Sequence, residues 1–303
     1  MRVTVLAGGT GAAKFIRGLV RVIPPRDVTV IVNTGDDLEW WGLHVSPDID
    51  TIVYALLDLL DTERGWGRSG ETFHCRDAMA ALGAPVWFSL GDKDLATHLH
   101  RTVQLRQGKS LSEITAAIAP QVIPMTNDPV RTLVAMDDGE VPFQEFFVHR
   151  RHTGAVRGVR FESAETARPA PGVLQSIASA EVVVIAPSNP ITSVGPILAV
   201  PGIADALAST SARVAAISPI IGTAAFSGPA ARLMAMRGLP STAAGVALAY
   251  RPFLDVLLAD ESDRHLEPEI RQANARPHFT QILMRDTDAA ETLARETLDA
   301  EPL

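Results

Sequence analysis

The sequence predicts an α/β fold, built as a doubly wound and mostly parallel sheet with a smaller, mainly helical elaboration in the middle of the chain. Strand-like and helix-like runs alternate at both ends of the 303 residues, as they do in proteins whose parallel sheet is covered by helices. The run at 182–186 is continuously apolar and is followed by Pro187. Such a run is typical of a central parallel strand that is buried on both faces.

Each terminal region contributes its own series of elements. At the N-terminal end the pattern predicts strand 2–7, amphipathic helix 11–22, buried strand 28–32 and helix 49–60. At the C-terminal end it predicts strands 182–186, 213–217 and 254–258, helices 194–208 and 228–237, and a last pair of elements at 279–284 and 287–299. These elements form the expected core.

The middle segment, 61–170, has a different pattern. Helix-like stretches at 71–82, 94–106 and 111–118 precede two β-type stretches, 131–136 and 143–149, joined by the turn Asp137-Asp138-Gly139. An Asp-Gly turn between such stretches favours a hairpin. No long Gly/Ser-rich or charged linker isolates the segment, so we expect one domain over 1–303 with 61–170 as an inserted elaboration.

Composition restricts the class of protein. The formal net charge is −8, whereas a surface that binds nucleic acid needs clustered Lys and Arg. Cys75 is the single cysteine, which excludes an internal disulfide and a cysteine-rich zinc site and agrees with a reducing compartment. No apolar run is long enough to span a bilayer, and no signal-peptide layout is present. We therefore expect a cytoplasmic protein without nucleic-acid or membrane partners.

A glycine-rich loop follows the first strand. Gly8, Gly9, Thr10 and Gly11 open the expected helix, with Lys14 one turn later. Backbone N–H groups at a helix N-terminus bind anions, which indicates a phosphate site. A simple tight turn is the alternative. A nicotinamide dinucleotide site is disfavoured, because the second strand ends in Asn33 where an acid normally binds the ribose.

Acidic residues follow the second strand and open the next helix. They are Asp36, Asp37, Asp48 and Asp50. Because both loops leave the carboxyl edge of the sheet, where ligands gather, these carboxylates indicate a magnesium site shared with substrate phosphates. The alternatives are structural: Asp48 as the N-cap of the helix and Asp50 as a first-turn acid that complements the helix dipole.

A third loop follows strand 182–186. Ser188 and Asn189 offer short donors and acceptors there, suited to a base or a phosphate, although a Pro-bounded turn is the alternative. His98 and His100 lie two positions apart on an expected helix, so they point to different faces and do not suit a shared metal.

Taken together, the motifs resemble the 2-phospho-L-lactate transferase family over nearly the whole chain. They are Gly8-Gly9-Thr10-Gly11 with Lys14, Asn33-Thr34-Gly35-Asp36-Asp37, Pro47-Asp48 with Asp50-Thr51 and Tyr54, Gly65-Trp66-Gly67, Leu90-Gly91-Asp92 with Asp94-Leu95-Ala96-Thr97-His98, Asp128-Pro129-Val130-Arg131-Thr132, Phe143-Gln144-Glu145 with Phe147-Val148, and Pro187-Ser188-Asn189-Pro190. Their order and spacing make the resemblance specific.

The resemblance implies a Rossmann-like, magnesium-dependent and homodimeric enzyme of coenzyme F-420 biosynthesis. In that family a hydroxyl of the deazaflavin FO attacks the phosphorus next to a three-carbon acid in a guanosine diphosphate (GDP) adduct, and GMP leaves. The acid is phospholactate, phosphoenolpyruvate or phosphoglycerate, and the sequence leaves this choice open.

The resemblance also implies roles for individual residues. Magnesium would be held by Asp36, Asp37, Asp48 and Asp50; the guanosine diphosphate part by Gly8, Gly9, Thr10, Gly11, Asn33, Ser188 and Asn189; and FO by Asp92, Asp94 and His98. The catalytic residues would be Asp36, Asp50 and Lys14. The chain departs from the family pattern at Ala12, Ser227 and Ala231.

The alternative function is that of the related regulators, which bind a nucleotide-sugar without transferase activity. The retained segments Leu90 to His98 and Phe143 to Val148 favour the transferase. A flat deazaflavin needs an apolar slot, and the aromatic candidates for its walls are Trp87, Phe88, Phe143 and Phe147, for which burial in the core is the alternative.

Overall fold

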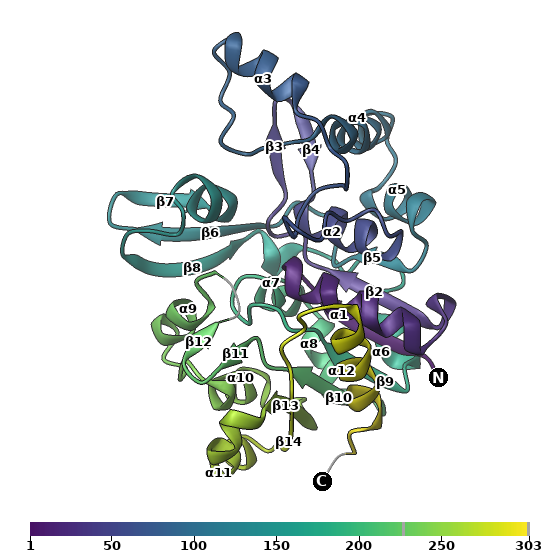
Figure 1. The fold of residues 1–303 in the computed structure, drawn as a ribbon, viewed down its shortest axis with the longest axis vertical. Coiled ribbons are helices and arrows are strands. Elements are labelled where there is room, and N and C mark those ends of the chain that lie inside the picture. Colours follow the sequence, from purple (N-terminus) through teal and green to yellow (C-terminus); the bar gives the residue numbers. More distant parts are fainter. Residues whose placement is uncertain (226–227, 302–303) are drawn as a thin grey trace.

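The computed structural model describes residues 1–225 and 228–301. Its centre is a seven-stranded sheet in the order β14-β13-β10-β9-β1-β2-β5, and every pairing in it is parallel (Figure 1). The strands are β1 (Val3–Ala7), β2 (Val28–Val32), β5 (Val122–Pro124), β9 (Val182–Ile185), β10 (Arg213–Ile217), β13 (Val256–Asp260) and β14 (Arg276–Thr280). The predicted α/β class with a doubly wound parallel sheet is confirmed.

Side chains of each central strand alternate between two apolar cores. In β1, Val3, Val5 and Ala7 pack on one face and Leu6 on the other. The first face is covered by α1 (Gly9–Val22), α2 (Pro47–Leu56), α5 (Leu111–Ile118) and α12 (Thr287–Asp299). The second face is covered by α6 (Val173–Ser179), α7 (Val194–Ala199), α8 (Ile203–Ser209), α9 (Ala230–Met236), α10 (Ala243–Tyr250) and α11 (Glu267–Gln272). Burial on both faces explains the continuous apolar strands.

The order of the strands reverses next to β1. From β1 the chain builds outward through β2 and β5, and it returns to the other side of β1 with β9, β10, β13 and β14. In open parallel sheets the crevice beyond the carboxyl ends of the strands at such a reversal is the usual ligand site. The loops that follow β1, β2 and β9 meet there.

Two smaller units lie beside this crevice, and the first includes residues 38–45, which precede the middle segment. A hairpin of β3 (Leu38–Trp40) and β4 (Leu43–Val45) packs with α4 (Asp92–Arg106), and α3 (His74–Ala81) projects beyond it (Figure 1). The antiparallel sheet β7-β6-β8 forms a side lobe from Gly139–Pro142, Arg131–Met136 and Val156–Glu162, followed after β7 by a π-helix, Glu145–His149. Residues 61–170 also contribute β5 to the central sheet.

The remaining elements are short. A hairpin of β11 (Ile220–Ile221) and β12 (Ala224–Ala225) follows β10, and 3₁₀ turns occur at Pro25–Asp27, Ala164–Thr166 and Glu261–Leu266. Across residues 1–225 and 228–301, no helix has the length and apolar character that crossing a bilayer requires.

Several expected elements differ from the structure. The expected strand 143–149 is wrong: β7 ends at Pro142, and the aromatic residues after it form the π-helix. The expected helix 194–208 is two helices, because Pro201 and Gly202 interrupt it and Gly202, at φ +89°, precedes α8. Three further expected elements have other boundaries. The helix expected at 49–60 is α2, which ends at Leu56, and the strands expected at 254–258 and near 279–284 are β13 (Val256–Asp260) and β14 (Arg276–Thr280).

Helix α1 crosses α12 closely at Gly18. A Cβ atom at Gly18 would lie 2.3 Å from the backbone carbonyl of Ala290. We expect Gly18→Ala to lower the free energy of unfolding by about 1–3 kcal/mol, although alanine normally stabilises a helix interior. Gly158→Ala is the control, because its Cβ would make only an ordinary contact, 3.8 Å from Ala135. Urea unfolding of both variants measures this, and a neutral or stabilising Gly18→Ala would show that the two helices are not in contact.

Candidate active site

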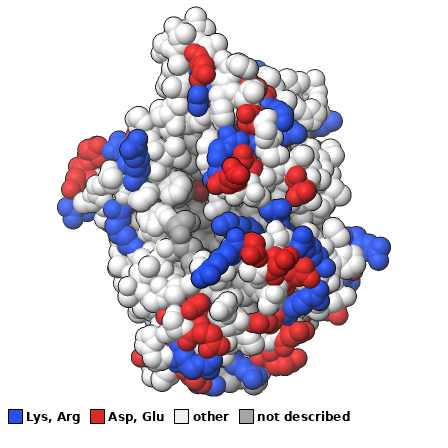
Figure 2. Space-filling view, viewed as in Figure 1, with Lys and Arg blue, Asp and Glu red and all other residues white. Residues whose placement is uncertain are grey.

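A cavity of about 520 Å³ opens at the carboxyl ends of β1, β2 and β9. In Figure 2 a hollow lies between the β6–β8 lobe, on the left, and the region of α1 and α2, on the right. The lining residues from the strand-end loops are Gly8, Gly9, Thr10, Gly11, Asp36, Pro47, Asp48, Pro187, Ser188, Asn189, Thr192 and Ser193. Those from the peripheral units include Trp66, Trp87, Phe88, Ser89, Phe143, Gln144, Phe147 and Val148.

The N-terminus of α1 forms one end of the cavity. The first N–H groups of a helix have no partner within it, and here Gly9 N–H donates to Asp48 Oδ1 at 2.8 Å, while Gly8 N–H donates to Ser188 Oγ at 3.3 Å. Thr10 and Gly11 follow in the first turn and line the cavity. The glycine loop therefore places a helix N-terminus at the cavity wall, which is the arrangement that the predicted anion site requires.

The glycines of this loop also permit close packing. A Cβ at Gly8 would lie 2.7 Å from Asp48 Oδ2, and one at Gly11 would lie 2.3 Å from the carbonyl oxygen of Pro187. Gly11 therefore brings α1 against the loop after β9. A larger residue at Gly11 would displace that loop as well as narrow the cavity.

Asp48 connects the strand-end loops to one another. Besides Gly9 N–H, it accepts a hydrogen bond from Asn33 Nδ2 at 2.9 Å, and Asn33 Oδ1 accepts from Gly35 N–H at 2.8 Å. The capping alternative for Asp48 is wrong, because Ser46 is the N-cap of α2 and Asp48 lies inside the first turn. Asn33 is fully buried and positions Asp48 instead of lining the cavity.

Asp36 carries a buried carboxylate with a free oxygen. Within the part of the chain that the structure describes, Asp36 Oδ1 has no hydrogen-bond partner. Burial raises the pKa of Asp36 well above 3.8, and the charge of Asp48 raises it further. Burial also raises the pKa of Asp48 to about 6, although the Asn33 and Gly9 hydrogen bonds oppose this. The raised pKa values indicate that no nearby positive charge compensates the negative charge of these two carboxylates.

The composition of the cavity wall fits a divalent cation that arrives with phosphates. None of its described lining residues is Lys, Arg or His. Among the described residues, no group of three or more acidic, His or Cys side chains is arranged to hold a metal by itself. Magnesium commonly binds one or two carboxylates and completes its octahedral shell with water and substrate phosphates. Asp36 and Asp48 match this donor set.

The other two predicted metal ligands have partners within the protein. Asp50 forms a buried ion pair with Arg101, whose Nη1 donates to Asp50 Oδ2 at 3.0 Å, and His98 Nδ1 lies 3.6 Å from the same oxygen. Asp37 accepts hydrogen bonds from Ser46 Oγ at 2.8 Å and pairs with His44 at 3.0 Å. Neither Asp37 nor Asp50 is among the residues that line the cavity.

The expected FO-binding residues of α4 lie away from the cavity. His98 is 1% exposed and its Nε2 lies 3.3 Å from Asp94, which also accepts a hydrogen bond from the Tyr54 hydroxyl at 2.6 Å. Asp92 accepts hydrogen bonds from the backbone N–H groups of His74 and Cys75 and so satisfies the start of α3. In the structure these residues join α2, α3 and α4, and none of them lines the cavity.

Some of the remaining predicted residues line the cavity and others do not. Ser188 and Asn189 line the cavity, and Asn189 Oδ1 also accepts the Ile191 N–H at 2.9 Å, so it supports its own turn. Lys14 is exposed and is not among the residues that line the cavity. Ser227 lies outside the described residues, and Ala231 lies in α9.

Aromatic side chains form the opposite part of the cavity. Phe143 and Phe147 stack at 5.5 Å with an interplanar angle of 14°, and Trp87 packs edge-on to Phe88 at 6.0 Å. All four proposed wall residues line the cavity. The π-helix after β7 allows Phe143 and Phe147 to face it together. Such π-helical turns are frequent at functional sites.

Some cavity residues had no individual role in the sequence-based prediction. Gln144, Trp66, Thr192 and Ser193 all line the cavity. Only their membership of the motifs shared with the family pointed to Gln144 and Trp66 as functional residues. Nothing in the sequence indicates that Arg101 is buried, because an arginine on a helix with polar residues normally faces solvent. In the structure this side chain is 2% exposed.

Comparison with known proteins identifies the family. The family model described as 2-phospho-L-lactate transferase CofD matches residues 3–300. The chain belongs to the 2-phospho-L-lactate transferase family. The resemblance drawn from the motifs is confirmed, and the chain is a transferase of this family.

Relatives from bacteria and archaea match along almost their whole length. The phosphoenolpyruvate transferase of Streptomyces coelicolor is 45% identical, with 98% of this chain and 97% of the relative covered. The 2-phospho-L-lactate transferase of Methanosarcina mazei is 38% identical, with 98% and 99% covered. A solved structure of a Bacillus halodurans protein of the UPF0052 family has a TM-score of 0.62 at 18% identity, covering 98% of this chain and 99% of that one, and shows the same fold.

The buried carboxylates of this transferase predict a dependence of stability on pH. Asp36 has a raised pKa in the folded state, so the unfolded state loses its proton more readily, and the folded protein loses stability as pH rises above about 4. We expect Asp36→Asn to raise the melting temperature at pH 8 without magnesium, and to change it much less at pH 4. The exposed Asp205→Asn is the control. A variant with the same melting temperatures as wild type at both pH values would show that ionisation of Asp36 does not destabilise the folded protein.

The ion pair of α2 and α4 predicts a stability effect of a different kind. Arg101→Met leaves the Asp50 carboxylate buried without its guanidinium partner, so we expect a loss of about 3–5 kcal/mol in the free energy of unfolding. Adding Asp50→Asn should recover part of the loss. Arg106→Met on the exposed side of α4 is the matched control. Equal denaturation midpoints for Arg101→Met and Arg106→Met would contradict the buried pair.

Proposed function

We propose that this protein transfers a phosphoenolpyruvyl-type group from its guanosine diphosphate adduct to the deazaflavin FO, with release of GMP and with magnesium as cofactor. The observation that carries the proposal is that one cavity joins a helix N-terminus, which suits an anion, to a group of aromatic side chains. Thr10 and Gly11 at the start of α1 form the anion end, and Phe143 and Phe147 form part of the aromatic end. A reaction between a nucleotide-linked acid and a flat heterocycle needs both ends.

The requirement for magnesium follows from charge. A diphosphate at the start of α1 would lie beside Asp36 and Asp48, and the described lining residues supply no cationic side chain. Helix N–H groups favour negative charge by only a fraction of a full charge. A magnesium ion held by Asp36 and Asp48 would neutralise the diphosphate and polarise the phosphoryl oxygen under attack.

The protein's own groups have positioning roles in this reaction. The N–H groups of Thr10 and Gly11 would bind the diphosphate, and Ser188 and Asn189 would contact the nucleotide from the loop after β9. The aromatic slot would orient FO so that its hydroxyl oxygen bonds to the phosphorus next to the acid, while the bond from that phosphorus to the GMP oxygen breaks and the hydroxyl proton passes to a carboxylate or to water. Phosphoryl transfer depends mainly on such positioning and on neutralisation of charge.

The names of the relatives support the choice of acid. Four Streptomyces and Kitasatospora proteins that are 42–46% identical are named phosphoenolpyruvate transferases. The archaeal 2-phospho-L-lactate transferases are 37–38% identical. The identity is therefore higher to proteins that carry the phosphoenolpyruvate name, and we assign the unsaturated acid on this basis.

The proposal is tested by incubating the protein with FO, magnesium and each guanylylated acid, and identifying products by mass. We expect the phosphoenolpyruvate adduct to give the fastest turnover. Asp36→Asn and Asp48→Asn should each lower kcat by at least about 100-fold, because an electrostatic stabiliser of the transition state is lost. Asp205→Asn, on the surface of α8, should keep the wild-type rate.

Two results would contradict the proposal. Wild-type activity in the presence of excess chelator would exclude the metal. Binding of a nucleotide-sugar together with no turnover of any guanylylated acid would favour the regulatory function instead.

A further inference from the structure

Gln144 places a carboxamide in the aromatic part of the cavity. It precedes the π-helix as its N-cap residue, is 8% exposed, and lines the cavity together with Phe143, Phe147 and Val148. Throughout residues 1–225 and 228–301, no hydrogen bond to the Gln144 side chain is present, in contrast to the bonded amide of Asn33. Its amide oxygen and nitrogen are not enclosed by the protein but open to the cavity, so an acceptor and two donors are available to a ligand that replaces the water there.

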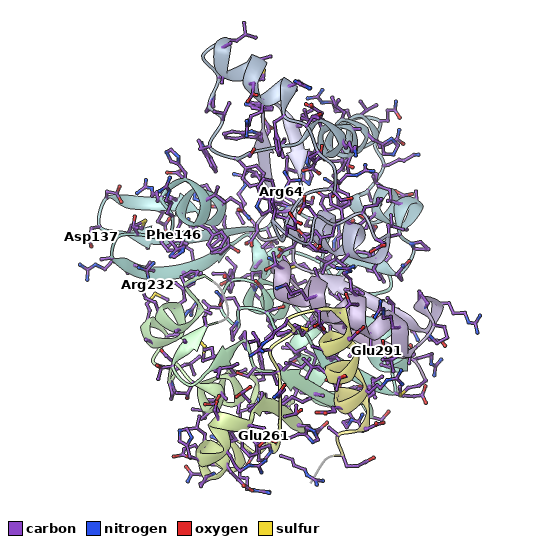
Figure 3. All side chains as sticks on the ribbon, in the orientation of Figure 1. Arg64, Asp137, Phe146, Arg232, Glu261 and Glu291 are labelled. Carbon is purple, nitrogen blue, oxygen red and sulfur yellow. The ribbon has the colours of Figure 1, made fainter. Side chains whose placement is uncertain are left out.

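The segment around Gln144 is held in place before any ligand binds. Arg150 donates from Nε and Nη2 to Glu145 Oε1 at 3.2 and 3.0 Å, so the residue that follows the π-helix is bonded to its first residue. Arg232 of α9 lies 5.5 Å from the centre of the Phe146 ring and donates to the His152 carbonyl at 2.6 Å (Figure 3). A side chain on such a supported backbone loses little freedom when it binds, which favours a specific contact.

The surroundings define the chemistry of the partner. Phosphates are unsuited to this position, because Phe143, Phe147 and Val148 offer no charge, whereas the α1 N-terminus does. A planar heterocycle that packs on the aromatic walls and presents a ring N–H beside a ring carbonyl matches the amide, whose oxygen accepts and whose nitrogen donates. Gln and Asn read adenine in DNA by the same paired geometry.

We propose that Gln144 is a specificity-determining residue that reads the imide edge of the pyrimidinedione ring of FO. Its Oε1 accepts the ring N3–H, and its Nε2 donates to an adjacent ring carbonyl. This inference rests on the proposed function, since it deepens the assignment of the aromatic slot to the deazaflavin. A guanine base, which also carries a ring N–H beside a carbonyl, is the competing occupant, and the experiment separates the two.

The test compares the affinities of Gln144→Leu and wild-type protein for FO, by fluorescence titration, and for GDP with magnesium, by calorimetry. We expect the affinity for FO to fall about 10- to 100-fold, because the ring N–H and carbonyl lose their partner, with the GDP affinity unchanged. Gln175→Leu, at an exposed position of α6, is the matched control and should bind both ligands as wild type does. The melting temperature of Gln144→Leu should not fall, because no intramolecular hydrogen bond is lost.

A modified ligand makes the test specific to the contact. FO methylated at N3 cannot donate to Gln144, so wild-type protein should bind it about 10- to 100-fold more weakly than FO, whereas Gln144→Leu should bind the two with similar affinity. Equal affinity of wild-type protein for both ligands would overturn the inference. So would a Gln144→Leu variant that loses GDP affinity and keeps FO affinity. Failure of wild-type protein to bind FO at all would instead refute the proposed function on which the inference rests.

Discussion

The site depends on the hydrogen bonds of a single buried carboxylate, that of Asp48. It accepts from Gly9 N–H at the start of α1 and from Asn33 Nδ2 at the end of β2, and it is itself carried by α2. Asn33 in turn binds the Gly35 N–H, and Thr132 N–H binds the Gly35 carbonyl, which fixes the backbone beside Asp36. The start of α1, the end of β2, helix α2 and the start of β6 are thereby held around one cavity.

In this arrangement the negative charge of two buried acidic residues has no positive counterpart in the described cavity wall. Asp36 and Asp48 are buried together with raised pKa values, and the walls of the cavity that the structure describes contain no basic side chain. A ligand that brings positive charge therefore gains more here than it would at an exposed carboxylate pair. Under the proposed function, a cation bound by the two carboxylates would favour a diphosphate beside it, and the diphosphate would complete the ligands of the cation, which would couple their binding.

Much of the fold and part of the site could be predicted from the sequence. The apolar strands, the glycine loop, and Asp36, Asp48, Ser188 and Asn189 at strand ends follow local rules of burial and topology. Residue spacing could not separate Asp36 from Asp37, or Asp48 from Asp50, because the distinction comes from long-range partners: Arg101 pairs with Asp50, and His44 pairs with Asp37.

Hydrogen bonds and packing that residue spacing does not reveal also determine the aromatic segment and the α4 motif. The stretch 143–149 has the composition of a strand, but Phe143 and Phe147 face the cavity from a turn that contains a π-helix. Arg150, the next residue along the chain, bonds to Glu145 of this helix, and Arg232 of the distant α9 packs on Phe146. Asp92, Asp94 and His98 resemble a ligand-binding motif, yet their hydrogen bonds go to Thr72, Tyr54 and neighbouring backbone. In this structure the motif joins α2, α3 and α4.

The position of the metal tests the account most directly. A crystal structure with GDP and manganese in place of magnesium, with an anomalous difference map, locates the ion independently of the refined atoms. The account predicts one strong peak within coordination distance of Asp36 and Asp48 and of the diphosphate, with Asp50 still paired to Arg101. A peak coordinated by Asp50, with Arg101 turned away, or a diphosphate bound far from the start of α1, would contradict it.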